Sequence, residues 1–244
     1  MPNDPVVHRL VPFQRLGMAV LHFLALQRST ITQAEAERTL ALFGPPGVGK
    51  TEGALAATLR EGIAVMSISA SMFASEVEGG AVQILEALLA EMERWSREHG
   101  IDIVLMLDDL DLSILAQDET QDIGATINTQ LLLNRFHKLA EERHLYRTVS
   151  GGPIPFIVTM NDPTVLRASL LREGRCMMFE HVPTTAEKID IAYAVLNPRT
   201  ASERELVAAL VKKFAAKQSV AFWKSLRSRV IAHTHKKLLQ DGLP

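Results

Sequence analysis

The sequence predicts an α/β protein, a three-layer sandwich around a central parallel sheet, followed by a small all-helical C-terminal lid. Short apolar runs alternate with longer amphipathic segments from residue 40 to about residue 181, as expected of parallel strands covered by helices on both faces. After Pro183 the strand signal stops, and only helical patterns follow. A glycine-rich loop joins the first apolar run to the first helical segment, an arrangement typical of phosphate-binding α/β folds.

Three regions follow from this alternation: a helical lead-in over 1–38, an α/β domain over 39–183 and the lid over 184–244. Fully apolar runs predict strands at 40–43, 64–69, 101–107, 154–160 and 177–181. Helical periodicity predicts helices at 49–60, 80–97, 120–142, 163–171, 184–196, 202–216 and 219–239. Leu85, Leu89 and Met92 share one helical face, so we expect them in the core.

Composition and charge restrict the class of protein. The chain has 244 residues, of which 47% are hydrophobic, enough for a full globular core. Its formal net charge of -2 gives no overall basic character, so binding to nucleic acid is not favoured. No apolar run approaches the roughly 18 residues of a membrane span, and the start lacks the pattern of a secretion signal. The single cysteine, Cys176, is expected to be a small buried side chain in a cytoplasmic protein.

Residues 44–51 read Gly-Pro-Pro-Gly-Val-Gly-Lys-Thr, the complete pattern of a phosphate-binding loop. Glycines let backbone N–H groups turn toward phosphate oxygens, the lysine reaches the β and γ phosphates, and the threonine hydroxyl ligates Mg²⁺. A glycine-rich turn that only caps a helix is the alternative. We expect a nucleoside triphosphate to contact one continuous run: Gly44, Pro45, Pro46, Gly47, Val48, Gly49, Lys50, Thr51 and Glu52.

Two acidic residues follow the apolar run 101–107. Asp108 is expected to bind Mg²⁺ through a water, beside Thr51 as a direct ligand. Asp109 stands where many ATPases use a glutamate to activate the attacking water. Because aspartate is shorter, and a displacement of about 1 Å can cost on the order of a hundredfold in rate, we expect slow turnover. The alternative is that both acids only cap the strand and open a loop.

A polar residue, Asn161, follows the apolar run 154–160. Neighbouring parallel strands deliver their carboxyl ends to the same edge of a sheet, so Asn161 is expected near Asp108. There its amide can bond the attacking water or the γ phosphate. Since Asn161 precedes Asp-Pro, it could also be a plain turn residue.

Two arginines, Arg172 and Arg175, lie three residues apart in Leu-Leu-Arg-Glu-Gly-Arg. Arginines in this pattern are often solvated surface residues. In a chain with a phosphate loop, the sharper expectation is that they reach the γ phosphate bound to a neighbouring subunit.

The chain resembles an AAA+ ATPase in the order of its parts: phosphate loop, acidic strand end, polar residue, arginine pair and helical lid. Within that class the chain is similar to the Rubisco activase family in three segments. These are Ile-Val-Thr-Met-Asn-Asp at 157–162, Leu-Leu-Arg-Glu-Gly-Arg at 170–175 and the lid stretch at 218–230. The resemblance implies a P-loop AAA+ fold in which an arginine of the lid senses the nucleotide. Arg227 is the first candidate for this role and Arg229 is the second.

The resemblance also implies an activity and partners. It implies a Mg²⁺-dependent ATPase that forms a homo-oligomeric ring, expected to be a hexamer, and uses ATP hydrolysis to remodel a protein partner. The chain departs from activases in its Pro-containing phosphate loop and in Asp108, and it ends sooner after the lid arginines. The resemblance implies Rubisco as the client, and these departures widen the expectation to Rubisco or a related complex.

The acidic, glycine-rich segment 76–80 stands where AAA+ rings place a loop facing the pore, with Phe73 expected to pack inward. This favours a limited pull over steady threading, and a plain surface turn is the alternative. Two other functions fit the sequence. Asp109 fits an ATP-gated assembly module with slow or vestigial hydrolysis. The basic C-terminal helix, with Lys224 and Arg227 among its charges, fits a nucleic-acid loader ATPase.

Overall fold

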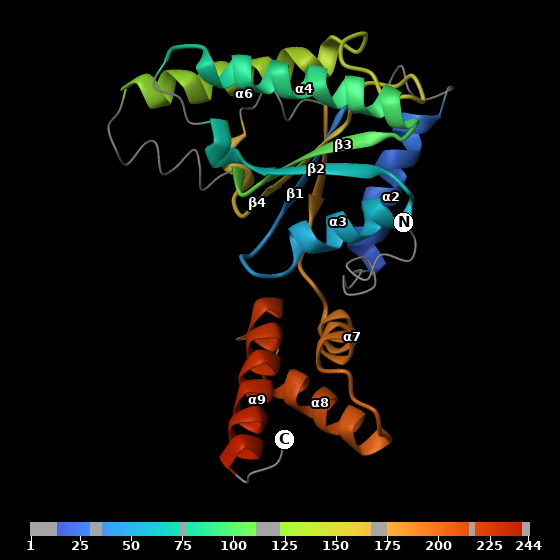
Figure 1. Cartoon of the computed structure of the whole chain (residues 1–244), viewed down its shortest axis with the longest axis vertical. Coiled ribbons are helices and arrows are strands. Elements are labelled where there is room, and N and C mark those ends of the chain that lie inside the picture. Colours follow the sequence, from blue (N-terminus) through green and yellow to red (C-terminus); the bar gives the residue numbers. More distant parts are fainter. Residues whose placement is uncertain are drawn as a thin grey trace. The chain divides into compact units, whose positions relative to one another are not determined.

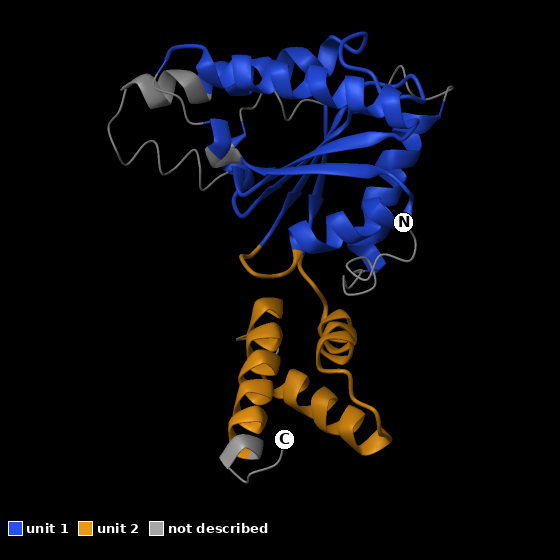
Figure 2. Ribbon diagram, viewed as in Figure 1, with its two compact units in different colours: residues 1–44, 50–181 blue, residues 45–49, 182–244 orange. Residues whose placement is uncertain are grey.

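The computed structural model describes residues 14–29, 36–73, 77–110, 123–166, 175–214 and 218–240. The chain divides into two compact units, coloured separately in Figure 2. The first comprises residues 1–44 and 50–181, and the second comprises 45–49 and 182–244.

A five-stranded parallel sheet forms the centre of the first unit, as predicted. The strands lie in the order β2-β3-β4-β1-β5. Their bounds are β1 (Thr39–Phe43), β2 (Ala64–Ser69), β3 (Ile103–Asp108), β4 (Phe156–Met160) and β5 (Cys176–Glu180). Nearly every residue of β1, β3 and β4 is buried, which explains why these strands read as continuous apolar runs in the sequence.

Helices cover both faces of this sheet, which makes the predicted three-layer sandwich (Figure 1). On one face α2 (Gln14–Arg28) packs against α3 (Lys50–Arg60). On the other face α4 (Gly80–His99) packs against α6 (Ile123–Glu141). Leu85, Leu89 and Met92 of α4 are buried in the core, and Phe73 packs inward at 2% exposure, as expected.

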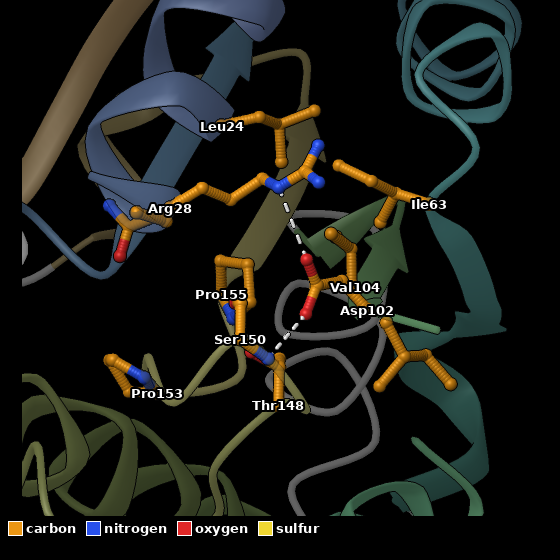
Figure 3. A pocket seen from close by; sticks show the side chains of 11 residues that line it. Leu24, Arg28, Ile63, Asp102, Val104, Thr148, Ser150, Pro153 and Pro155 are labelled. Atoms are coloured by element: carbon orange, nitrogen blue, oxygen red, sulfur yellow. Dashed lines mark hydrogen bonds and ion pairs between the residues drawn. The ribbon is translucent and has the colours of Figure 1, made fainter. Parts of the chain in front are cut away.

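The sheet edge opposite the phosphate loop is tied to α2 by Asp102, which precedes β3 (Figure 3). One Asp102 oxygen pairs with the Arg28 Nε at 3.2 Å, and the other accepts the Ser150 N–H at 3.0 Å. The adjoining cavity is about 10 Å³, enough for the centre of one water, and apolar residues such as Leu24 and Ile63 line much of it. This feature is therefore a structural tie and has no room for a larger ligand.

Some predicted element ends were wrong, for identifiable reasons. The third strand begins at Ile103, two residues late, because the Ile101 N–H donates to the Ser96 carbonyl at the end of α4. The fourth begins at Phe156, since Pro155 has no N–H to give to the sheet. In place of the helix expected from residue 163, a 3-10 turn covers Pro163–Val165 and ends at Leu166. Residues 167–171 of that expected helix lie outside the described residues.

Cys176 is buried in β5 at 8% exposure, as expected, and burial raises the pKa of its thiol to about 12. Relative to the ordinary value of 9.0, that shift leaves about a thousandfold less thiolate at pH 8. We therefore expect a thiol reagent at pH 8 to label the native protein very slowly and the urea-unfolded protein within minutes. Absorbance of the released thiolate measures both rates. Rapid labelling of the native protein would contradict this description of β5.

Three helices make up most of the second unit. They are α7 (Thr185–Leu196), α8 (Ala201–Phe214) and α9 (Val220–Gln240), and α7 packs against both others. A capping box between Thr184 and Glu187 starts α7. Residues 45–49 belong to this unit, where the Gly47 carbonyl accepts the Ala221 N–H at 3.2 Å. Among the described helices of the whole chain, none has both the length and the apolar character needed to cross a bilayer.

Candidate functional site

The candidate site lies where three neighbouring strands of the first unit end. β1 ends at Phe43 and leads into Gly44, β3 ends at Asp108, and β4 is followed by Asn161. The helix that follows the loop, α3, begins at Lys50. Because β3, β4 and β1 are adjacent and parallel, their carboxyl ends meet at one edge of the sheet.

Lys50 connects two of these strand ends. Its side chain is only 6% exposed, and its Nζ donates to the Gly44 carbonyl at 2.9 Å and to Asn161 Oδ1 at 3.1 Å. These two contacts hold the ammonium group between the start of the phosphate loop and the end of β4. A lysine held at the first turn of the helix that follows a phosphate loop is placed to meet a phosphate oxygen, so the geometry fits anion binding.

Thr51, Asp108 and Thr159 form a second cluster, here called the Thr-Asp-Thr cluster. Asp108 Oδ1 accepts from the Thr51 hydroxyl at 2.5 Å and from the Thr159 hydroxyl at 2.6 Å. Thr51 gives its proton to the carboxylate and so keeps oxygen lone pairs for a metal. Hydroxyl and carboxylate oxygens are ligands that Mg²⁺ prefers. The donor set therefore fits Mg²⁺, and Thr51 and Asp108 are the residues that would hold it.

Asp109, the second acid, has an uncommon backbone conformation. Its φ is 52°, in the left-handed region that non-glycine residues enter rarely, although Asp and Asn tolerate it best. Its N–H donates to the Thr159 hydroxyl at 3.2 Å. The backbone turn at this residue lets the chain leave β3 immediately after Asp108.

The phosphate loop itself needs glycine at three points. Gly44, Gly47 and Gly49 have φ values of 143°, 69° and 89°. A Cβ on Gly44 would lie 2.4 Å from the His181 carbonyl oxygen, closer than real atoms approach. In the remainder of the run Val48 is buried, Glu52 is half-buried, and Pro45 and Pro46 are exposed.

The predicted arginines are not all at this edge. Arg175 directly precedes β5, and β5 begins beside Thr39 at the other end of β1. Five strand residues at about 3.3 Å each put Arg175 about 16 Å from the carboxyl end of the sheet. Its guanidinium contacts Glu141 and His137 of α6. Arg172 lies outside the described residues, and Arg227 is exposed on α9 of the second unit.

A model of AAA, the ATPase family associated with various cellular activities, matches residues 40–184 of this chain. The chain belongs to the AAA family. The match runs from the second residue of β1 to the residue before α7 and so spans the strand-and-loop framework described above. In this AAA protein the phosphate loop, Asp108 and Asn161 therefore occupy a framework shared with nucleotide-dependent ATPases.

Individual relatives extend the similarity. The chain is 32% identical over 197 residues to the ribulose bisphosphate carboxylase/oxygenase activase of Nostoc sp., covering 78% of this chain and 47% of that protein. It is 26% identical to the chloroplastic activases of Phaseolus vulgaris and Chlamydomonas reinhardtii, over 88% and 83% of this chain and 49% and 50% of theirs. This AAA protein is thus a distant homologue of Rubisco activases and spans about half their length.

Sequence reasoning missed Thr159. The residue reads as an ordinary β-branched strand former, and it is fully buried in β4. Alternation along a strand gave a usable signal, since Thr159 precedes Asn161 by two positions and so points to the same side. A hydroxyl two residues before the polar strand end of an AAA protein is therefore worth testing as part of the site.

Proposed function

We propose that this AAA protein is a Mg²⁺-dependent ATPase that forms a homo-oligomeric ring and uses hydrolysis to remodel a protein client. One observation carries the proposal: Lys50 contacts Asn161, and Thr51 contacts Asp108, at one edge of the same sheet. A cation for phosphate, an oxygen pair for Mg²⁺ and an amide for water are the parts that phosphoryl transfer to water requires. Bound Mg²⁺ would neutralise charge that develops on the phosphate oxygens.

The proposed roles follow from the contacts. Backbone N–H groups of the phosphate loop and the Lys50 ammonium hold the β and γ phosphates. Thr51 and Asp108 hold the metal, Asp109 takes a proton from the attacking water, and Asn161 orients that water. Arg227 senses the nucleotide from the second unit.

A ring is supported by the position of Arg175. About 16 Å of strand separates it from the phosphate loop of its own subunit, which is too far for its side chain to reach a nucleotide there. A role in phosphate chemistry therefore requires a neighbouring subunit, as with arginine fingers supplied in trans. We propose a hexamer in which Arg175 and Arg172 serve the adjacent site.

Homology alone supports the proposed client. The relatives named as activases of ribulose bisphosphate carboxylase/oxygenase favour that enzyme, or a related complex, as the protein that is remodelled. The exposed Val77 beside Glu78, in the turn that precedes α4, is a candidate contact for such a client in the pore of the ring.

Turnover and assembly test the proposal together. Purified protein should hydrolyse ATP only with Mg²⁺, with a specific rate that rises with protein concentration as rings form. Arg175→Ala should lose most of that rate and keep ATP affinity, and adding it to the wild type should lower the rate of mixed rings. Arg94→Ala, a change at an exposed arginine of α4, is the control. Hydrolysis independent of Arg175 would contradict the trans role.

Asp109 supports a second candidate, an ATP-gated assembly module with vestigial hydrolysis. If aspartate is too short to activate water well, Asp109→Glu should raise kcat on the order of 10- to 100-fold. The left-handed backbone at this position should make the variant slightly less stable. Steady-state turnover and thermal unfolding measure the two effects. An unchanged kcat would mean that side-chain length does not limit turnover, and ATP-dependent assembly without turnover would favour the module.

A further inference from the structure

A single hydroxyl joins the two acids of the candidate site. Thr159 is fully buried in β4, beside β3, one residue beyond the Leu107–Val158 pair. Its Oγ1 donates to Asp108 Oδ1 at 2.6 Å and accepts the Asp109 N–H at 3.2 Å. The side chain of one acid and the backbone of the other therefore depend on the same atom.

The hydrogen atoms available define this arrangement further. Thr51 and Thr159 each have one hydroxyl proton, and both donate to Asp108 Oδ1. Their two oxygens lie 3.5 Å apart, but no proton remains to join them. Asp108 Oδ1 is thus held from two sides, once from the phosphate-loop helix α3 and once from β4. Two donors on one oxygen fix the rotation of the carboxylate.

The contact with Asp109 has a different effect. A non-glycine residue is strained in the left-handed region and persists there only when its surroundings hold it. The Thr159 oxygen accepts the N–H of this residue, whose φ is 52°. The hydroxyl therefore helps to set the direction in which the Asp109 side chain leaves the backbone.

Packing alone does not explain a hydroxyl at this position. The neighbours of Thr159 along β4 are Val158 and Met160, both buried and apolar. Valine has the shape of threonine without the oxygen and suits a buried parallel strand at least as well. The hydroxyl lies at a place where its partners are Asp108 and Asp109.

We propose that Thr159 is a positioning residue. It orients the Asp108 carboxylate toward Mg²⁺ and the Asp109 side chain toward the attacking water. The inference rests on the proposed ATPase function. It gives this part of the sheet two roles. Asn161, which follows β4, contacts Lys50, and Thr159 within β4 holds Asp108, the acid proposed to bind the metal.

Three substitutions isolate the hydroxyl. Thr159→Val removes the oxygen and keeps the shape, whereas Thr159→Ser and Thr159→Ala both lose the methyl group and differ from each other only in the hydroxyl. The matched control is Thr39→Val, the same change at the first residue of β1, away from the candidate site. Among the described residues, the buried Thr39 hydroxyl has no hydrogen-bond partner. Thermal unfolding of each variant establishes that it is folded.

The measurements are Mg²⁺ dependence of nucleotide binding and the separate values of kcat and KM. We expect Thr159→Val and Thr159→Ala to need more Mg²⁺ and to lose kcat by about 10- to 100-fold, the usual effect of removing a group that orients a metal ligand. ATP affinity without Mg²⁺, and KM at saturating Mg²⁺, should change less than about threefold, because the Lys50 contacts are intact. Thr159→Ser should restore most of both losses, and Thr39→Val should match the wild type.

Each outcome has a definite meaning. If Thr159→Ala and Thr159→Ser behave alike, or if Thr159→Val keeps its Mg²⁺ dependence and kcat, the inference is wrong while the proposed ATPase function stands. A wild type that binds ATP but does not hydrolyse it still tests the inference through Mg²⁺ dependence. A wild type that binds no nucleotide overturns the proposed function and the inference together. If Thr159→Val does not fold, the Ser and Ala pair decides.

Discussion

Lys50→Ala is expected to lower ATP hydrolysis by on the order of 10²- to 10³-fold and to weaken ATP binding. The buried ammonium is the only cation that the described residues place in hydrogen-bond contact with both the phosphate loop and the β4 strand end. Removing it takes away the positive charge that we propose meets phosphate, at a buried position where charge interactions are strong. It also leaves Asn161 Oδ1 without that donor. Turnover by phosphate release and affinity by a fluorescent ATP analogue measure the two losses.

Lys212→Ala, on the exposed surface of α8, is the control for this change and should behave as the wild type. A second readout comes from stability. ATP with Mg²⁺ should raise the unfolding temperature of the wild type and of Lys212→Ala, but far less that of Lys50→Ala, because ligand binding stabilises only the state that binds. Full hydrolysis by Lys50→Ala would falsify the assignment of the phosphate loop.

Arg38→Met is expected to cost about 3 to 5 kcal/mol of folding free energy, through loss of charge-assisted hydrogen bonds and exposure of buried carbonyls to apolar surroundings. Arg38 is fully buried, and the described residues offer it backbone carbonyls as hydrogen-bond partners. The closest are those of Leu139 at 2.7 Å and Ile154 at 2.9 Å, with Leu145 at 3.2 Å. Burial lowers the pKa of Arg38 to about 9, which still leaves it charged at neutral pH.

The contacts explain the size of the effect. One planar group joins the end of α6, the loop after it and the segment before β4, and it lies 4.8 Å from the Phe156 ring centre. The melting temperature should fall by roughly 10 °C, since each kcal/mol corresponds to about 2–4 °C in a chain of this size. Arg38→Lys should recover less than half, because an ammonium cannot reach these carbonyls as a planar fork. Arg94→Met, at an exposed arginine, is the control and should melt near the wild type. An Arg38→Met protein of unchanged stability would show that other bonds hold this junction.

Apolar patterning predicted the strands well and their ends less well. β2 was predicted at its observed bounds because alternating helix and strand signals flank it on both sides. The start of β3 depended on Ser96, whose carbonyl accepts the Ile101 N–H and whose hydroxyl donates to the Ile101 carbonyl at 2.7 Å. No local sequence pattern predicts this pair of hydrogen bonds. The strand order β2-β3-β4-β1-β5 is likewise set by packing between distant segments.

Most residues of the candidate site were predictable from the sequence, but the hydrogen bonds that connect them were not. Motif spacing named Lys50, Thr51, Asp108 and Asn161, which the structure brings together. Thr159 lay within an apolar run, and only the pairing of β3 with β4 shows that its hydroxyl meets both acids. Arg38 had no signal at all, since a charged residue before a strand is usually solvated. Its partners are carbonyls of residues more than a hundred positions later.

The narrow approach between Gly44 and His181 has a consequence for evolution of the loop. No side chain fits at residue 44, since even a methyl group would collide with a main-chain oxygen of the segment that follows β5. If residue 44 is randomised in a library, selection for ATP turnover and selection for soluble expression should both recover glycine at this position. Glycine there would thus persist in descendants that have lost catalysis, and its presence cannot serve as a marker of an active enzyme.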